Sequence, residues 1–327
     1  MTISKKIISA AVVAGLGLSM SAQGATLKTP SETITGIEAF DWQQGNALAV
    51  GGTTAILNFA TNSCVAGEPD CNFDVFGHAR LSAFTGAGVS QSNLTTGELT
   101  YVFGFQETVV EFIQSPITGN TASFDFVDSV LKGGGSNFFR VYYDAVANSD
   151  DLAGTGFDDG TLILEGVLEE ANAASFSNFR VGDPSSTVLL GSAGSTPATP
   201  TNAAGWGATE TVVGNGLTET LSLTVASITV NAAFFPSQAV LSFLLDNISQ
   251  ITPFTTVDPS LSFPEGGIAD TTARVGPVNG LVVGGDSIIL QTDTNSPITT
   301  AGIPEPASLA LLGLGFAGIG FARRRKS

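Results

Sequence analysis

Apolar and polar side chains alternate along much of this chain, which is the pattern of β-strands with one buried face. The clearest case is Thr220–Val225, where three apolar residues alternate with two threonines and a serine. The apolar positions change parity at Ala226 and Ser227, which predicts a β-bulge there. Further strands are predicted at Thr33–Phe40, Thr53–Phe59, Val75–Phe84, Glu98–Phe105, Ser123–Val130, Phe138–Tyr143, Thr161–Leu168, Val240–Leu245 and Asp286–Leu290.

Glycine-rich turns separate these segments, for example at Gly133–Gly135 and Gly214–Gly216. Only Val167–Ala174, with its Leu, Glu and Ala residues, has the composition of a helix. Many short strands joined by such turns are typical of an antiparallel β-sandwich or a jelly roll. We therefore predict an all-β fold.

Two polar stretches bear on the domain organisation. Gly191–Gly207 is rich in Ser, Thr, Pro and Gly, and is either a linker between two β lobes or a long surface loop in one domain. Residues 293–302 are interpreted as a polar spacer that follows a secreted acidic β domain over residues 25–292. That length accommodates one large β domain or two small ones.

The N-terminal segment has the features of a secretory signal peptide over residues 1–24. Two lysines precede the apolar run Ile7–Leu18, which is too short for a membrane anchor. Small residues follow at Ala22 and Gly24, so signal peptidase is expected to cut between Gly24 and Ala25. We therefore expect export from the cytoplasm.

The C-terminal segment combines an extended motif, an apolar run and a basic cluster. Proline keeps the motif extended, where a protease can reach it. The run Ala307–Ala322 spans roughly 24 Å as a transmembrane helix, against about 30 Å of hydrocarbon, which suits transient retention better than a permanent anchor. The cations hold its end on the cytoplasmic side. The motif and the cluster consist of Pro304, Glu305, Pro306, Arg323, Arg324, Arg325 and Lys326.

This order of features in Ile303–Ser327 resembles the PEP-CTERM sorting signal, the substrate mark of exosortase in Gram-negative bacteria. The resemblance implies passage through the inner membrane and cleavage near Pro304–Pro306. It also implies a final location at the cell surface or in the extracellular matrix.

Charge is distributed unevenly between the two signals and the body. Six of the 12 cations lie in the signals, but only Glu305 of the 29 acids does, so the body between them carries a net charge of −22. Such a surface repels nucleic acid and anionic lipid, which argues against both as partners of the body. It suits divalent cations or basic groups on other macromolecules, and solubility alone is the alternative explanation.

The two cysteines, Cys64 and Cys71, enclose only six residues. In an oxidising compartment this spacing predicts a disulfide that closes a small surface loop. A metal site would need further thiols or a nearby pair of histidines.

Catalytic signatures are scarce in this sequence. The single histidine, His78, lies on an alternating strand beside Arg80 and is expected to be half-exposed. One histidine excludes most imidazole metal sites and most Ser-His-Asp triads. Glu107 and Glu111 are predicted to share a strand face, but the tryptophan-rich cleft of sugar enzymes is missing. We interpret the protein as non-enzymatic.

An acidic loop at Asp144–Gly160 is the strongest candidate for a binding site. Calcium takes six to eight oxygen ligands, which a flexible loop rich in Asp and Gly can supply. The alternative is a solvated loop whose Asp and Asn side chains make turn hydrogen bonds. The candidate calcium ligands are Asp150, Asp151, Asp158 and Asp159.

The segment Phe138–Gly166, with its core YYD…DLAGTGFDDGTLILEG, resembles the flocculation-associated PEP-CTERM proteins of floc- and biofilm-forming bacteria. The resemblance implies a protein that is exported, loses its tail, associates with exopolysaccharide and holds cells together. It implies no catalytic residues. Three hypotheses result: an aggregation-promoting matrix protein, a calcium-dependent carbohydrate-binding module, and a secreted polysaccharide hydrolase.

Overall fold

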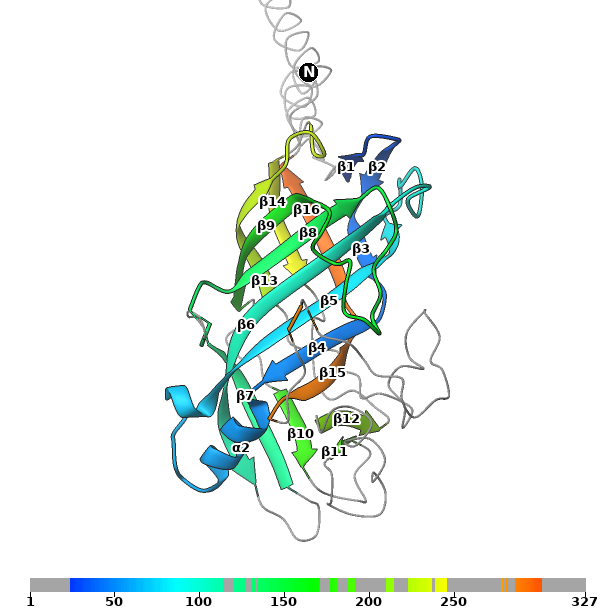
Figure 1. Cartoon of the computed structure of the whole chain (residues 1–327). Helices are drawn as coiled ribbons and strands as arrows, with labels where there is room; N and C mark the ends of the chain where they lie inside the picture. The colour runs from blue at the N-terminus through cyan, green and yellow to red at the C-terminus, as the bar shows by residue number, and fades with distance from the viewer. Residues whose placement is uncertain are drawn as a thin grey trace, which may run out of the picture.

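Strands dominate the body of the protein, which is an elongated structure built around one curled sheet (Figure 1). The computed structural model describes residues 24–113, 120–127, 131–132, 134–170, 177–181, 188–191, 210–214, 223–236, 239–245, 278, 280–281 and 286–301. These residues confirm the predicted all-β class, and their strands pair antiparallel except for Glu210–Gly214, which lies parallel to Ile288–Thr292. The predicted signal peptide, apart from Gly24, and the predicted sorting signal lie outside them. No helix among the described residues is long and apolar enough to cross a membrane.

The strands are β1 (Ala25–Lys28), β2 (Thr33–Ile37), β3 (Ala39–Trp42), β4 (Gly45–Val50), β5 (Asn72–Thr85), β6 (Glu98–Ile113), β7 (Asn120–Val127), β8 (Phe138–Asp144), β9 (Thr161–Glu170), β10 (Ser177–Val181), β11 (Val188–Gly191), β12 (Glu210–Gly214), β13 (Leu223–Val230), β14 (Ala239–Leu245), β15 (Ile288–Thr292) and β16 (Asn295–Ala301). The described residues also form the α-helix α2 (Gly52–Ala60) and the 3₁₀ turn η1 (Pro69–Cys71). The strands predicted at Val75–Phe84, Glu98–Phe105 and Phe138–Tyr143 are confirmed within β5, β6 and β8.

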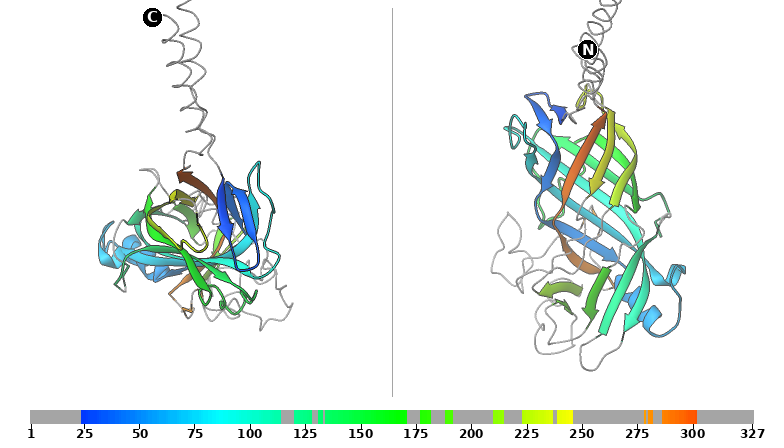
Figure 2. Two further views of the ribbon diagram at one scale, coloured as in Figure 1. Left: turned by 90° about the horizontal axis from the view of Figure 1, so that it is seen from above. Right: turned by 180° about the vertical axis from the view of Figure 1, so that it is seen from behind.

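Two long strands, β5 and β6, connect the two ends of the body. In one half, the order β6-β8-β9-β13-β14-β16-β3-β5 returns to β6, so the strands form a closed ring. In the other half, β5 continues to β4, β15, β12 and β11, while β6 continues to β7 and β10. Figure 2 shows both halves from behind, with β5 and β6 running through them. The two layers expected of a sandwich are thus opposite walls of one sheet.

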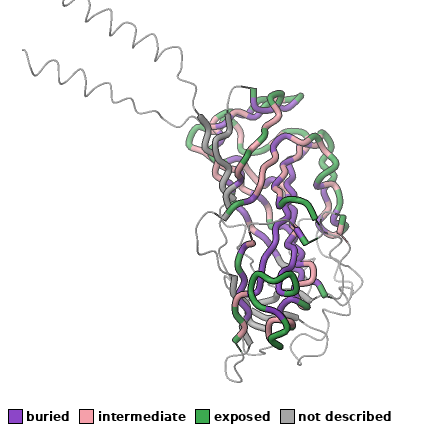
Figure 3. Tube along the Cα trace, turned by 90° about the vertical axis from the view of Figure 1, so that its left-hand side faces the viewer, coloured by how far each residue is buried: buried purple, intermediate pink, exposed green. Residues whose placement is uncertain are grey.

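Aromatic side chains fill the interior of the ring. Tyr101, Phe103 and Phe105 alternate along β6 and point inward, as their spacing predicts, and all three are buried. The Trp42 ring meets Tyr101 edge to face, with ring centroids 4.7 Å apart. Buried segments follow the strands along the whole length of the body (Figure 3). Burial of each such ring contributes about 1.5–3 kcal/mol, so this aromatic column is the main source of stability.

Residues 293–302 are not the predicted polar spacer, because Asn295–Ala301 forms β16 and closes the ring between β14 and β3. The hydroxyl groups of this polar segment accept hydrogen bonds from the buried aromatic side chains of the ring. Trp42 Nε1 donates to Ser296 Oγ at 2.8 Å, and the Tyr101 hydroxyl donates to Thr294 Oγ1 at 3.3 Å. A buried hydroxyl costs little when it satisfies a buried donor, so these polar residues belong to the core.

Tyr101 gives the fold a specific sensitivity to alkaline pH. Burial raises the pKa of its phenol from 10.0 to about 12. The folded state therefore holds the proton more tightly than the unfolded chain, and the resulting stabilisation is complete below pH 10 and lost between about pH 10 and 12. We expect the free energy of unfolding to fall by roughly 3 kcal/mol over this window, and Tyr101→Phe to remove that fall. Urea unfolding across the window tests this, with Tyr143→Phe as control, and an equal fall in both variants would contradict it.

One predicted strand is a helix in the structure, and one predicted helix is a strand. Thr53–Phe59 lies in the helix α2 rather than in a strand, since Gly52, Ala55, Ile56 and Phe59 form one stripe that packs on the core. The predicted helix Val167–Ala174 is wrong over its described part, because β9 continues to Glu170 and pairs with β13. Residues 171–174 lie outside the described residues.

The predicted bulge in β13 is confirmed. The register of β13 against β9 shifts between Ala226 and Thr229, and Ser227 has a φ of 51°. Residues 192–207 of the predicted lobe boundary lie outside the described residues. Strands from before and after this segment nevertheless pair in one sheet, as β9 does with β13.

Cys64 and Cys71 form a disulfide bond, with their Cα atoms 5.8 Å apart. The bond closes the loop between α2 and β5, and Cys71 is fully buried. By the chain-entropy argument, so short a closure contributes about 2–3 kcal/mol.

Candidate functional site

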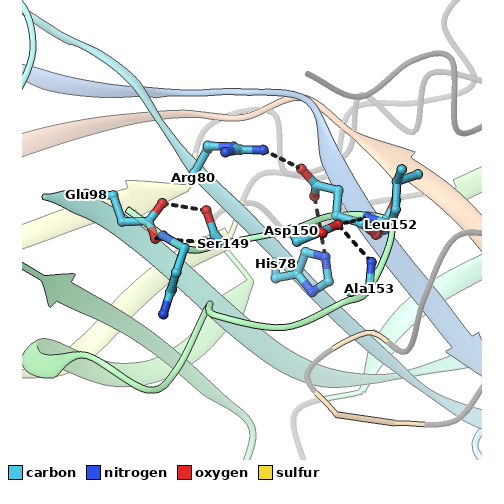
Figure 4. A network of polar contacts seen from close by, with 10 residues as sticks. His78, Arg80, Glu98, Ser149, Asp150, Leu152 and Ala153 are labelled. Atoms are coloured by element: carbon cyan, nitrogen blue, oxygen red, sulfur yellow. Dashed lines mark hydrogen bonds and ion pairs between the residues drawn. The ribbon is translucent and has the colours of Figure 1, made fainter. Parts of the chain in front are cut away.

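The acidic loop between β8 and β9, residues 145–160, folds back over the outer face of the sheet and is anchored on β6. Glu98 accepts hydrogen bonds from the backbone N–H groups of Asn148 and Ser149, at 2.6 and 2.8 Å. Figure 4 shows this carboxylate reaching Ser149. Thr100 donates its hydroxyl to the carbonyl of Phe157 at 2.8 Å. Both halves of the loop are thereby held on one strand.

The middle of the loop is held by a buried carboxylate. Asp151 is 1 % exposed, and its carboxylate lies 3.5 Å from His78 Nε2 and 3.4 Å from Arg80 Nη2. Asn46 Nδ2 also donates to the Asp151 carbonyl at 2.9 Å. The two contacted side chains stand on the outer face of β5, and Figure 4 shows them converging on the loop.

His78 is fully buried, so the predicted half-exposed position is wrong. The Phe157 ring stacks on the imidazole with ring centroids 3.7 Å apart and planes 8° apart. The alternation of β5 places His78 correctly on the outer face, but only the docked loop removes it from water. This imidazole is a packing surface for the loop.

The four candidate calcium ligands do not converge. Asp150 Oδ1 accepts the backbone N–H groups of Leu152 and Ala153, at 2.8 and 2.9 Å, which is a side-chain turn of the kind Asp favours. Asp151 faces β5, whereas Asp158 and Asp159 are exposed, and Asp159 accepts a bond from Asn148 Nδ2. Across the described ranges no group of three or more His, Cys, Asp or Glu side chains could hold a metal ion.

A separate groove of about 560 Å³ lies on the outer face of β8, β9 and β13. Arg140 and Glu165 stand directly opposite each other on β8 and β9, and Arg140 Nε is 3.7 Å from Glu165 Oε2. The Arg140 guanidinium also lies over the Phe138 ring, with Cζ 4.7 Å from the centroid. Sequence reasoning missed this pair, although its signal was an alternating strand carrying one of the body's six cations.

Aromatic side chains flank Arg140 on the outer face of β8. Partial burial raises the pKa of the Tyr142 phenol, and the neighbouring Arg140 opposes that rise. Phe138, Arg140 and Tyr142 alternate with the buried Phe139 and Val141, so they share the outer face of β8. One positive charge thus stands between two rings on this strand.

Comparison with known protein families matches residues 302–326 to the PEP-CTERM protein-sorting motif. The chain is a PEP-CTERM protein. The match covers the Pro-Glu-Pro motif, the apolar run and the basic cluster predicted from the sequence, and indicates an exported surface protein that is processed by exosortase. No curated protein and no solved structure matches the chain. The resemblance of Phe138–Gly166 to flocculation-associated proteins stays a prediction.

The sorting motif of this PEP-CTERM protein begins directly after the folded body. β16 ends at Ala301 and the motif begins at residue 302. Both ends of the body, β1 and the end of β16, lie close together at the same end of the ring (Figure 1). At about 3.5 Å per residue, Pro304 is within roughly 10 Å of Ala301. Only Gly302 and Ile303 separate the last strand of the ring from the Pro-Glu-Pro motif in the sequence.

Proposed function

We propose that this PEP-CTERM protein, after processing by exosortase, associates with exopolysaccharide at the cell surface or in the matrix and promotes cell aggregation, as in flocs and biofilms. The observation that carries the proposal is the sorting motif at residues 302–326, which directly follows the folded acidic β body. The resemblance of Phe138–Gly166 to flocculation-associated proteins gives the proposal its specific form.

The proposal includes no catalytic step. Its support is that His78 is enclosed between Phe157 and Asp151, away from solvent. Glu107 and Glu111, the acid pair predicted to share a face, are separated by a register shift in β6, so Glu107 is buried whereas Glu111 is exposed. A glycoside hydrolase needs two carboxylates on either side of its substrate, and this pair does not offer that arrangement.

The calcium-dependent alternative is the weaker one. Calcium takes six to eight oxygen ligands, whereas Asp150 and Asp151 already serve the loop and leave Asp158 and Asp159 as the exposed pair.

Deletion of the gene in the native host is expected to abolish floc formation. We expect the settling rate of the deletion strain to fall to that of dispersed cells, because nothing then joins the exopolysaccharide of neighbouring cells. Complementation with the full-length gene should restore settling, while the empty vector serves as control. A deletion strain that settles like the parent would refute the proposed function.

A further inference from the structure

The groove on β8, β9 and β13 has the size and the chemistry of a ligand site. We propose that it binds a segment of a neutral, hydroxyl-rich polysaccharide. Its volume of about 560 Å³ falls in the range of pockets that hold small ligands. This inference rests on the proposed function, since it names where the polymer binds and which class of polymer is bound.

The Arg140–Glu165 pair carries the recognition. The guanidinium offers only donors and the carboxylate only acceptors, and their nearest atoms are 3.7 Å apart. A sugar hydroxyl both donates and accepts, so neighbouring hydroxyls of one sugar can bond to both side chains at once. Arg140 and Glu165 are 42 % and 45 % exposed, and a ligand can therefore reach them.

The surroundings hold this pair in place and add further polar groups. The Phe138 ring supports the guanidinium from below by a cation–π contact. Ser227 and Thr229 line the groove from β13, and the bulge at Ser227 sets their position against β9. Gly166 forms part of the lining, where a Cβ would come within 2.3 Å of Val225 Cγ1. A larger residue there would push β9 and β13 apart.

Charge selects a neutral polymer over an acidic one. The Arg140–Glu165 pair has no net charge, so it does not require a charged ligand. The body carries a net charge of −22, which repels polyanions over roughly 10 Å at ordinary salt concentrations. Among the described residues that line the groove, Arg140 is the only cation.

The test uses the protein in the form that the host produces, purified from host cells in detergent. Its ligand is the extracellular polysaccharide of the same host, separated by anion exchange into neutral and acidic fractions. Binding is measured by affinity electrophoresis. We expect binding to the neutral fraction, and a loss of about 10-fold or more in both Glu165→Gln and Arg140→Lys, which remove charge-assisted or bidentate hydrogen bonds. Glu169→Gln is the matched control, because Glu169 is exposed on the same strand but outside the groove.

Thermal unfolding of each variant separates lost binding from lost folding. Unchanged affinity in folded Glu165→Gln and Arg140→Lys overturns the groove proposal, as does preference for the acidic fraction or binding to neither fraction. The first two results leave the proposed function standing, whereas binding to neither fraction would also remove the exopolysaccharide association that the proposed function includes. Normal settling of the deletion strain together with groove-dependent binding would instead reject the proposed function and keep the site.

Discussion

Replacing Pro304 and Pro306 together with alanine is expected to leave the chain as an uncut precursor in the membrane fraction, with little of it reaching the surface. Proline prevents helix formation through the motif, whereas alanine is the strongest helix former, so the double variant removes the extended backbone that a protease needs. Because Ala301 ends a strand of the ring, residues 302–306 are also the only segment between the folded body and the apolar run. Pulse-chase labelling with immunoblots of membrane, surface and medium fractions measures the effect.

The matched control for this variant is Ser308→Ala, which changes one small residue of the same tail outside the Pro-Glu-Pro motif. It should be processed like the parent chain. Normal release of the double proline variant would mean that extended backbone at this motif is not what exosortase requires.

Asp151→Ala should be among the most destabilising single substitutions in the loop between β8 and β9. It removes a carboxylate that is 1 % exposed and contacts both His78 and Arg80. Removal of one partner from a buried ion pair costs about 3–5 kcal/mol, and the partial exposure of Arg80 places the expected loss near about 3 kcal/mol. The loop should then detach, which exposes the stacked Phe157 and His78 rings. Urea unfolding measures the stability, and limited proteolysis within residues 145–160 measures the detachment.

Two further variants show whether the effect belongs to this contact. Asp158→Ala removes an exposed acid from the same loop and should change stability by less than about 0.5 kcal/mol. Asp151→Asn keeps the shape of the side chain and should fall between the two. Equal stability and equal proteolysis in Asp151→Ala and Asp158→Ala would show that the loop does not depend on the buried carboxylate.

The alternation of apolar and polar residues predicted strands and the β-bulge well where one face of a strand packs on the core. The bulge at Ala226–Ser227 was visible because the apolar positions change parity, and a change of parity has a direct meaning in a pleated strand. The prediction failed where local preference and tertiary pairing disagree. Val167–Glu170 has helical composition, yet pairing with β13 holds it in a strand.

Helix α2 was predicted wrongly for a different reason. The sequence contains helical spacing in this segment, but the prediction gave more weight to residues that favour a strand. Thr53 and Thr54 favour a strand, but Gly52, Ala55, Ile56 and Phe59 follow helical spacing. Part of the candidate site was predictable in the same sense. The Asp-rich loop was visible in the sequence, while the burial of Asp151 was not, since its partners His78 and Arg80 lie about 70 residues away along the chain.

The sequence alone determined the sorting signal, the all-β class and the acidic character, and it predicts the N-terminal signal peptide, because each depends on composition or on the order of residues within a short segment. Tertiary structure decided that residues 295–301 complete a ring, that His78 is buried, and that Arg140 and Glu165 lie side by side in the lining of a groove. These features arise from contacts between strands and loops far apart in the sequence. Whether a polar residue is solvated or buried depends on the partner that folding brings to it.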